Sequence, residues 1–153
     1  MCFLLYAGTT KPIPRNEWRE GAVTLPVESL AEHDAPIRAH FGNPEVQYIG
    51  STSGCGCDFP HLLMQNGGWP FLKDPRRGAE RDASDRHNME ALVALLRTTG
   101  EETVELYGVW DGNFANTPRA REDVSLENLL VADFHFKEGG FYRVSLESEL
   151  SAA

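Results

Sequence analysis

Three thiols and one imidazole are the side chains whose types and spacing best suit reactive chemistry. Cys55 and Cys57 are separated by one glycine, His61 follows Cys57 by four residues, and Cys2 lies far from them in the sequence. Thiolate sulfur and imidazole nitrogen are ligands that zinc and other soft or borderline metals accept. The spacing is not that of a zinc finger or ribbon. These residues nevertheless predict a metal site made of Cys55, Cys57, His61 and Cys2, with zinc as one suitable ion.

The loop that holds two of the thiols has other interpretations. Ser51 and Ser53 share this glycine-rich loop, so we assign them with Cys55 and Cys57 to a ligand or thiol site. A thiol just before a helix N-terminus has a lowered pKa, which favours redox chemistry. Successive loop amides can instead bind an anion. In the simplest interpretation, the glycines permit a tight turn and the cysteines are small buried apolar residues. No pattern identifies a catalytic base, so catalytic residues and enzymatic activity stay unassigned.

Two apolar segments are expected to position this loop. Residues 2–7 and 45–50 have the composition of strands, and Asp58 with Pro60 predicts a short helix after the loop. If the two strands pair antiparallel, Cys2 comes close to the loop. If they run parallel, about four to five residues at ~3.3 Å each separate the two ends. Antiparallel pairs are the commoner kind, so we expect Cys2 near Cys55 and Cys57.

The remaining sequence alternates between strand and helix patterns without a regular βαβ order. The clearest helix spans residues 85–98 with apolar residues at helical spacing, and residues 103–110 form a strand. Residues 69–83 are expected to be a long exposed loop, residues 116–123 a polar loop, and residues 133–146 a β-hairpin. The pattern predicts a single α+β domain over residues 1–146 and a frayed C-terminal tail over 147–153. We expect a mostly antiparallel sheet with helices packed on one face and one core cluster (Leu4, Tyr6, Ile49, Leu92, Val93, Leu96, Leu106 and Val144).

The charge balance limits the classes of partner. The chain has 23 acidic and 14 basic residues, for a net charge of −9. Such a surface repels phosphate backbones, so we expect no nucleic-acid binding. No apolar run is long enough to span a bilayer and no signal peptide is recognisable, so we expect no membrane partner and a cytoplasmic location. Thiols stay reduced there, which agrees with an odd number of cysteines.

Three segments carry a resemblance to known proteins. Residues 3–9, residues 46–51 with Gly54-Cys55-Gly56-Cys57, and residues 106–112 resemble a small family of uncharacterised bacterial proteins. The resemblance implies a bacterial source and no particular activity. Two hypotheses follow. The first is a thiol or metal site at Cys55 and Cys57, open to a cleft. The second is a non-enzymatic protein-interaction module in which both cysteines are buried in a structural turn and an apolar patch is exposed elsewhere.

Overall fold

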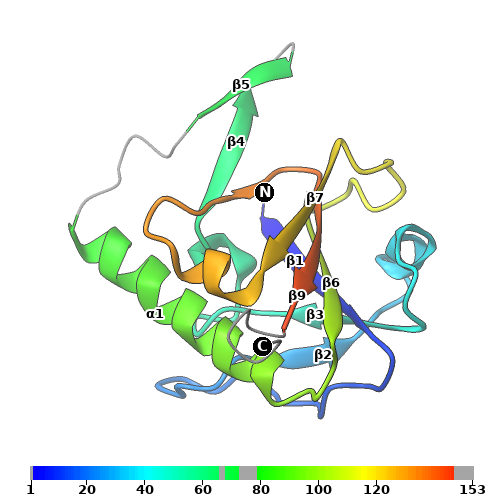
Figure 1. Cartoon of the computed structure of the whole chain (residues 1–153), viewed down its shortest axis with the longest axis horizontal. Coiled ribbons are helices and arrows are strands. Elements are labelled where there is room, and N and C mark those ends of the chain that lie inside the picture. The colour runs from blue at the N-terminus through cyan, green and yellow to red at the C-terminus, as the bar shows by residue number, and fades with distance from the viewer. Residues whose placement is uncertain (1, 66–67, 73–78, 147–153) are drawn as a thin grey trace, which may run out of the picture.

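A mixed sheet of six strands forms the centre of the computed structural model, which describes residues 2–65, 68–72 and 79–146 (Figure 1). The strand order is β2-β3-β1-β6-β9-β7. The strands are β1 (Phe3–Thr9), β2 (Val27–Ser29), β3 (Glu45–Ile49), β6 (Thr103–Trp110), β7 (Ala120–Ser125) and β9 (Gly140–Ser145). β7 runs parallel to β9, and the other neighbours in this sheet are antiparallel. The α+β expectation is confirmed in this coarse form, but the sheet is mixed.

A second, smaller sheet has the order β5-β4-β8. It consists of β4 (His61–Gln65), β5 (Gly68–Leu72) and β8 (Phe136–Lys137). β4 and β5 form a hairpin that projects away from the six-stranded sheet (Figure 1). The expected helix after the thiol loop is therefore wrong. Helical geometry ends at Asp58, and the chain continues as a strand because β5 and β8 both pair with it.

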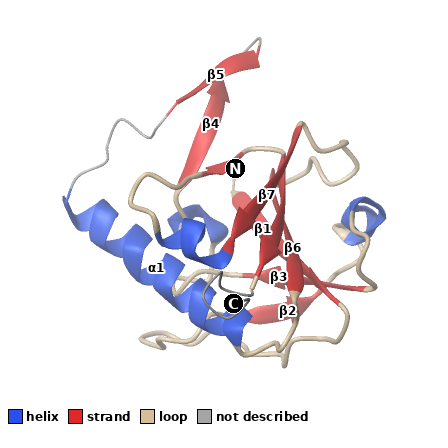
Figure 2. Cartoon of the chain, viewed as in Figure 1, coloured by secondary structure: helices blue, strands red, loops and turns tan. Residues whose placement is uncertain are grey.

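Within the described residues, the helices are one α-helix and three short 3₁₀ helices (Figure 2). α1 spans Ala79–Arg97, and the 3₁₀ helices are η1 (Ala35–His40), η2 (Gly56–Asp58) and η3 (Leu126–Leu130). α1 confirms the expected helix and begins earlier than the apolar spacing indicated. Within the stretch expected to be a loop, β5 and the start of α1 are formed, while residues 73–78 lie outside the described residues. The tail predicted for residues 147–153 also lies outside them.

The two faces of the sheet carry two separate core clusters, because side chains alternate along each strand. Phe3 and Leu5 pack with Leu92 and Leu96 of α1 on one face. On the other face, aromatic side chains from β1, β6 and β9 pack with Ile37 of η1. Helical segments therefore cover both faces, and the expectation of helices on one face is wrong. The eight residues predicted to form one core cluster are divided between these two. Leu4 and Tyr6 belong to the second cluster, and the other six belong to the first.

Two strand assignments near the C-terminus differ from the sequence patterns. The expected hairpin of residues 133–146 does not form, because β8 pairs parallel with β4 while β9 pairs with β6 and β7. The first four residues of β7 lie in a segment, residues 116–123, expected to be a polar loop. Arg121 and Asp123 are exposed on this edge strand, so part of the strand faces water and its sequence lacks an apolar signal. Among the described residues, no helix is both long and apolar enough to cross a membrane.

Candidate metal centre

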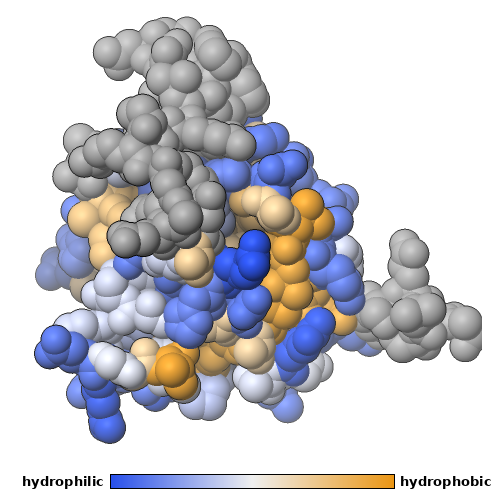
Figure 3. Space-filling view, turned by 90° about the vertical axis from the view of Figure 1, so that its left-hand side faces the viewer, coloured by the Kyte–Doolittle hydropathy of each residue, from blue (hydrophilic) through white to orange (hydrophobic). Residues whose placement is uncertain are grey.

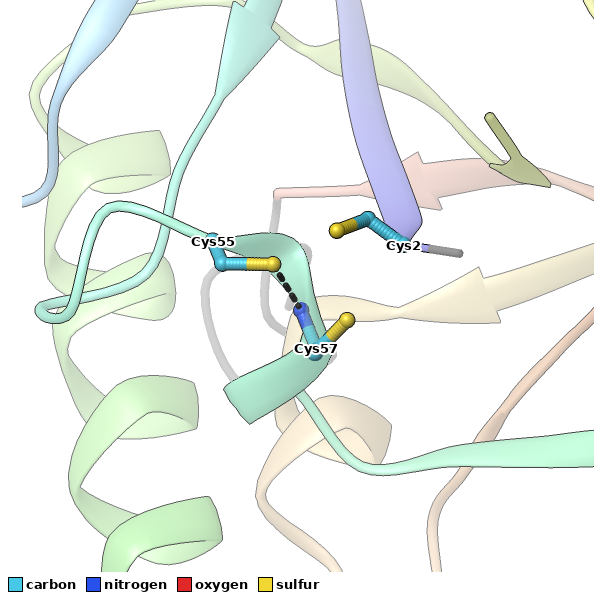
Figure 4. A group of neighbouring side chains, drawn as sticks. All are labelled: Cys2, Cys55 and Cys57. Carbon is cyan, nitrogen blue, oxygen red and sulfur yellow. Dashed lines mark hydrogen bonds between the residues drawn. The ribbon is translucent and has the colours of Figure 1, made fainter. Parts of the chain in front are cut away.

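The antiparallel pairing of β1 with β3 brings the three cysteines of the chain together. Leu5 lies opposite Ile49, so the start of β1 faces the loop that leaves β3. The side-chain sulfur atoms of Cys2, Cys55 and Cys57 all lie within 4.8 Å of one another. Figure 4 shows the three sulfurs converging between the start of β1 and the loop. The prediction that Cys2 lies near the other two cysteines is confirmed.

Close backbone contact holds the loop against β1. Gly56 is buried there, and a Cβ atom added to it would lie 2.5 Å from the carbonyl oxygen of Phe3 and 3.3 Å from the Cα atom of Leu4. Only glycine permits this approach. The Phe3 amide donates to Cys57 Sγ at 3.2 Å. The Cys57 amide lies 3.5 Å from Cys55 Sγ (Figure 4). The loop is therefore docked by one glycine and by amide–sulfur hydrogen bonds.

Three side chains from other elements fix the loop from outside. Asn88 of α1 is fully buried, and its Oδ1 accepts from the Thr52 amide at 2.8 Å. Trp18 Nε1 donates to the Thr52 carbonyl at 2.9 Å. Tyr48 Oη donates to the Gly54 carbonyl at 2.9 Å. None of the three was among the residues predicted for the site. Asn88 alone had a signal, because it is a polar residue four positions before Leu92 on the apolar stripe of the helix.

The two serines assigned to the site shape the loop from inside. Ser51 is fully buried, and its hydroxyl donates to the Cys55 carbonyl. The same Oγ atom lies 3.0 Å from Ser53 Oγ and 3.2 Å from Asp58 Oδ2. Ser53 is exposed. The structure thus places both serines beside the cysteines, with Ser51 in a bracing position.

Loop amides are engaged within the protein. The Thr52, Ser53 and Gly54 amides donate to Asn88 Oδ1, Ser51 Oγ and the Ser51 carbonyl, respectively. The amides of residues 57–59 donate to Cys55 Sγ, the Cys55 carbonyl and the Gly56 carbonyl. Anion binding by a nest needs amides that point outward together. This geometry therefore does not favour the anion-binding interpretation.

His61 occupies a different environment from the three thiols. Its ring stacks on Phe3 with centroids 4.6 Å apart and an interplanar angle of 3°. Its Nδ1 lies 2.7 Å from the Phe59 carbonyl, which can only accept a hydrogen bond. Among the described residues, the group with metal-binding spacing contains the three cysteines and not His61. The structure thus brings together three of the four expected ligands.

The surroundings of Cys2 and Cys55 favour the protonated form of these two thiols. A hydrogen bond with Cys55, together with the charge of Cys55, raises the pKa of the Cys2 thiol. Burial raises the pKa of Cys55. The expectation that a helix N-terminus lowers a thiol pKa here is wrong for Cys55, because η2 is a single short turn and desolvation of the thiolate outweighs its dipole. Burial also raises the pKa of Tyr48, so its phenol remains a donor.

All three cysteines are partly exposed. The interaction-module hypothesis expects Cys55 and Cys57 to be buried, and they are not. Its other expectation is an exposed apolar patch. Four apolar side chains are exposed, namely Val23, Val131, Trp18 and Leu130. One face also shows hydrophobic residues among hydrophilic ones (Figure 3).

No family model, no curated protein and no solved structure matches the chain. The assignment of the site therefore rests on its own geometry and chemistry.

Proposed function

We propose that this protein binds a metal ion through the thiolates of Cys2, Cys55 and Cys57. The observation that carries the proposal is the mutual approach of three sulfur atoms, within 4.8 Å, from segments more than fifty residues apart. Zn–S bonds of about 2.3 Å at tetrahedral angles place sulfurs about 3.8 Å apart. The cysteine side chains are partly exposed, and their rotation is the movement that would bring the sulfurs to this separation.

Binding is coupled to proton release. Metals bind the thiolate, so each cysteine that is protonated in the free protein loses its proton on binding. The raised pKa values of Cys2 and Cys55 mean that this release occurs at neutral pH. A reducing, cytoplasmic location is part of the proposal, because oxidised cysteines would not be ligands. Zinc is the first ion to test.

The test is elemental analysis and thiol titration on protein purified without a metal-binding tag. Zinc is then titrated into the metal-free protein in competition with a chromophoric chelator. Cys2→Ser and Cys55→Ser are each expected to abolish tight binding, because each removes one of three ligands. Ser29→Ala is the control, since it removes the hydroxyl of an exposed side chain on β2 and leaves the loop and every thiol in place.

The variants also separate the alternatives. If Cys55→Ser abolishes binding and Cys2→Ser does not, the three-thiol site is wrong and Cys2 is only a strand residue. If neither replacement changes bound metal or thiol reactivity, the loop is a structural turn and the interaction-module hypothesis takes precedence. Circular dichroism of each variant verifies that the fold is retained.

A further inference from the structure

Resting on the metal site proposed above, we propose that its ion is monovalent copper, held by three thiolates in a three-coordinate arrangement. Three features of the site distinguish copper from the other metals that thiolates bind. They are the kind of donor atoms, the number of donor atoms and the hydrogen bonds made to them.

The donor set consists of sulfur alone. Among the described residues, Cys2, Cys55 and Cys57 form the group with metal-ligand spacing. The nearest imidazole in the sequence, His61, is stacked on Phe3 and has one ring nitrogen at the Phe59 carbonyl. Soft thiolate ligands select Cu(I), zinc and iron–sulfur clusters over harder ions. A mixed nitrogen–sulfur set would have favoured zinc more strongly.

The number of ligands distinguishes copper from zinc. Structural zinc sites are almost always closed by four protein ligands. Nearby oxygen atoms in the described structure have other partners: Ser51 Oγ donates to the Cys55 carbonyl, and Tyr48 Oη donates to the Gly54 carbonyl. Three sulfurs therefore leave a zinc ion dependent on a water molecule as its fourth ligand, whereas they complete the coordination of a three-coordinate monovalent ion.

Hydrogen bonds to sulfur offset the charge of such a complex. Three thiolates and one Cu(I) ion carry a net charge of −2, compared with −1 for zinc, in a chain that is already acidic. The Phe3 amide donates to Cys57 Sγ, and the Cys57 amide is directed at Cys55 Sγ. Such donors to ligand sulfurs tune the electron density of a metal site. Partial exposure of the cysteines also places solvent around the remaining charge.

The experiment is a competition on the full chain under anaerobic conditions. Zinc-loaded protein receives one equivalent of Cu(I) supplied as its bicinchoninate complex. Copper keeps its oxidation state as it passes from the chelator nitrogens to the thiolates, and the displaced zinc is counted with a chromophoric chelator. We expect release of zinc in a 1:1 ratio to copper bound, and an X-ray absorption spectrum with three sulfur neighbours and no nitrogen.

Two results would overturn the copper inference and leave the metal site intact. One is that zinc stays bound while copper remains with bicinchoninate. The other is that His61→Gln weakens copper binding, which would show a fourth ligand. His61→Gln is expected to leave copper affinity unchanged. If metal-free protein binds neither ion, the proposed function itself fails. Cys57→Ser, with its fold verified by circular dichroism, is expected to lose copper binding and so ties the ion to this site.

Discussion

Two tyrosines face each other across β1 and β3, and their hydroxyls serve different regions of the molecule. Tyr6 lies opposite Tyr48 in the strand register, with ring centroids 5.7 Å apart. Tyr6 Oη donates to Asp34 Oδ2 at 3.0 Å, and Asp34 Oδ1 accepts from the Ala31 amide. Tyr48 Oη donates instead to Gly54, inside the thiol loop.

The buried Tyr6–Asp34 pair is a structural polar site, and it differs from the proposed metal site in its exposure and in its hydrogen bonds. Tyr6 and Asp34 are only 1% and 6% exposed, and each has a strong partner, as buried polar groups require. The cysteines are partly exposed, and the Phe3 and Cys57 amides donate to their sulfur atoms, which are weak acceptors. The polar atoms of Tyr6 and Asp34 are already engaged with each other, whereas the three converging sulfurs could coordinate an ion.

Tyr6→Phe is expected to have the largest effect on stability. It removes a hydrogen bond to a buried carboxylate, a loss of about 1.5–3 kcal/mol for a bond to a charged group. Urea unfolding measures the loss, and metal affinity and thiol reactivity should not change. A drop in metal affinity with little loss of stability would show that the two regions are not separate.

Gly56→Ala is expected to damage the thiol site while all three cysteines remain. The added methyl group meets the backbone of β1, which cannot move as a flexible side chain does. Overpacking of this kind costs about 1–3 kcal/mol in stability. Because the loop is displaced from Cys2, zinc affinity in the chelator assay should also fall. Unchanged affinity would mean that the docking of the loop does not position the ligands.

Tyr48→Phe is the matched counterpart of Tyr6→Phe on the thiol side. It removes a hydrogen bond to a neutral carbonyl, so the expected loss of stability is only about 0.5–1.5 kcal/mol. The loop loses one of its outside anchors, so its thiols should react faster with a thiol reagent. Equal reaction rates in Tyr48→Phe and the parent protein would contradict the anchoring role.

Glu101 is expected to give the smallest effect, at the other end of β1. Its carboxylate accepts from the Thr10 hydroxyl, the Thr10 amide and the Lys11 amide, and the Thr10 hydrogen bond lowers its pKa. A depressed carboxyl pKa adds stability above the unfolded pKa, and this is lost as pH falls through the folded value. Because the Glu101 carboxylate faces solvent, we expect it to contribute roughly a few tenths of a kcal/mol to the free energy of unfolding.

Glu101→Gln should therefore flatten the pH dependence of stability slightly below about pH 4.3, the ordinary glutamate pKa. Unfolding at several pH values measures the slope. Zinc affinity at neutral pH should be the same in this variant, because Thr10 and the cysteines lie at opposite ends of the strand. An altered affinity would indicate that strain passes along β1.

Sequence patterns predicted which residues are buried. They also predicted the pairing of β1 with β3, which positions the cysteines. β1 and β3 are apolar runs, and the preference for antiparallel pairing placed Cys2 correctly. Such patterns did not predict which strands pair with one another in the C-terminal third of the chain. Phe136 pairs beside His61 rather than in a hairpin, and β7 is polar because one of its faces meets water. The anchors Trp18 and Tyr48 act through distant backbone carbonyls, for which local spacing has no signal.

The central position of β1 has a consequence for the order of folding. Its neighbour β3 follows within fifty residues, but its other neighbour, β6, begins a hundred residues later in the chain. During synthesis β1 can pair on one side well before residues 103–110 exist. Until then the second edge of its apolar segment, Phe3 to Ala7, is open to other chains, and unpaired strand edges of this kind template aggregation. The loop carrying Cys55 and Cys57 emerges in that interval.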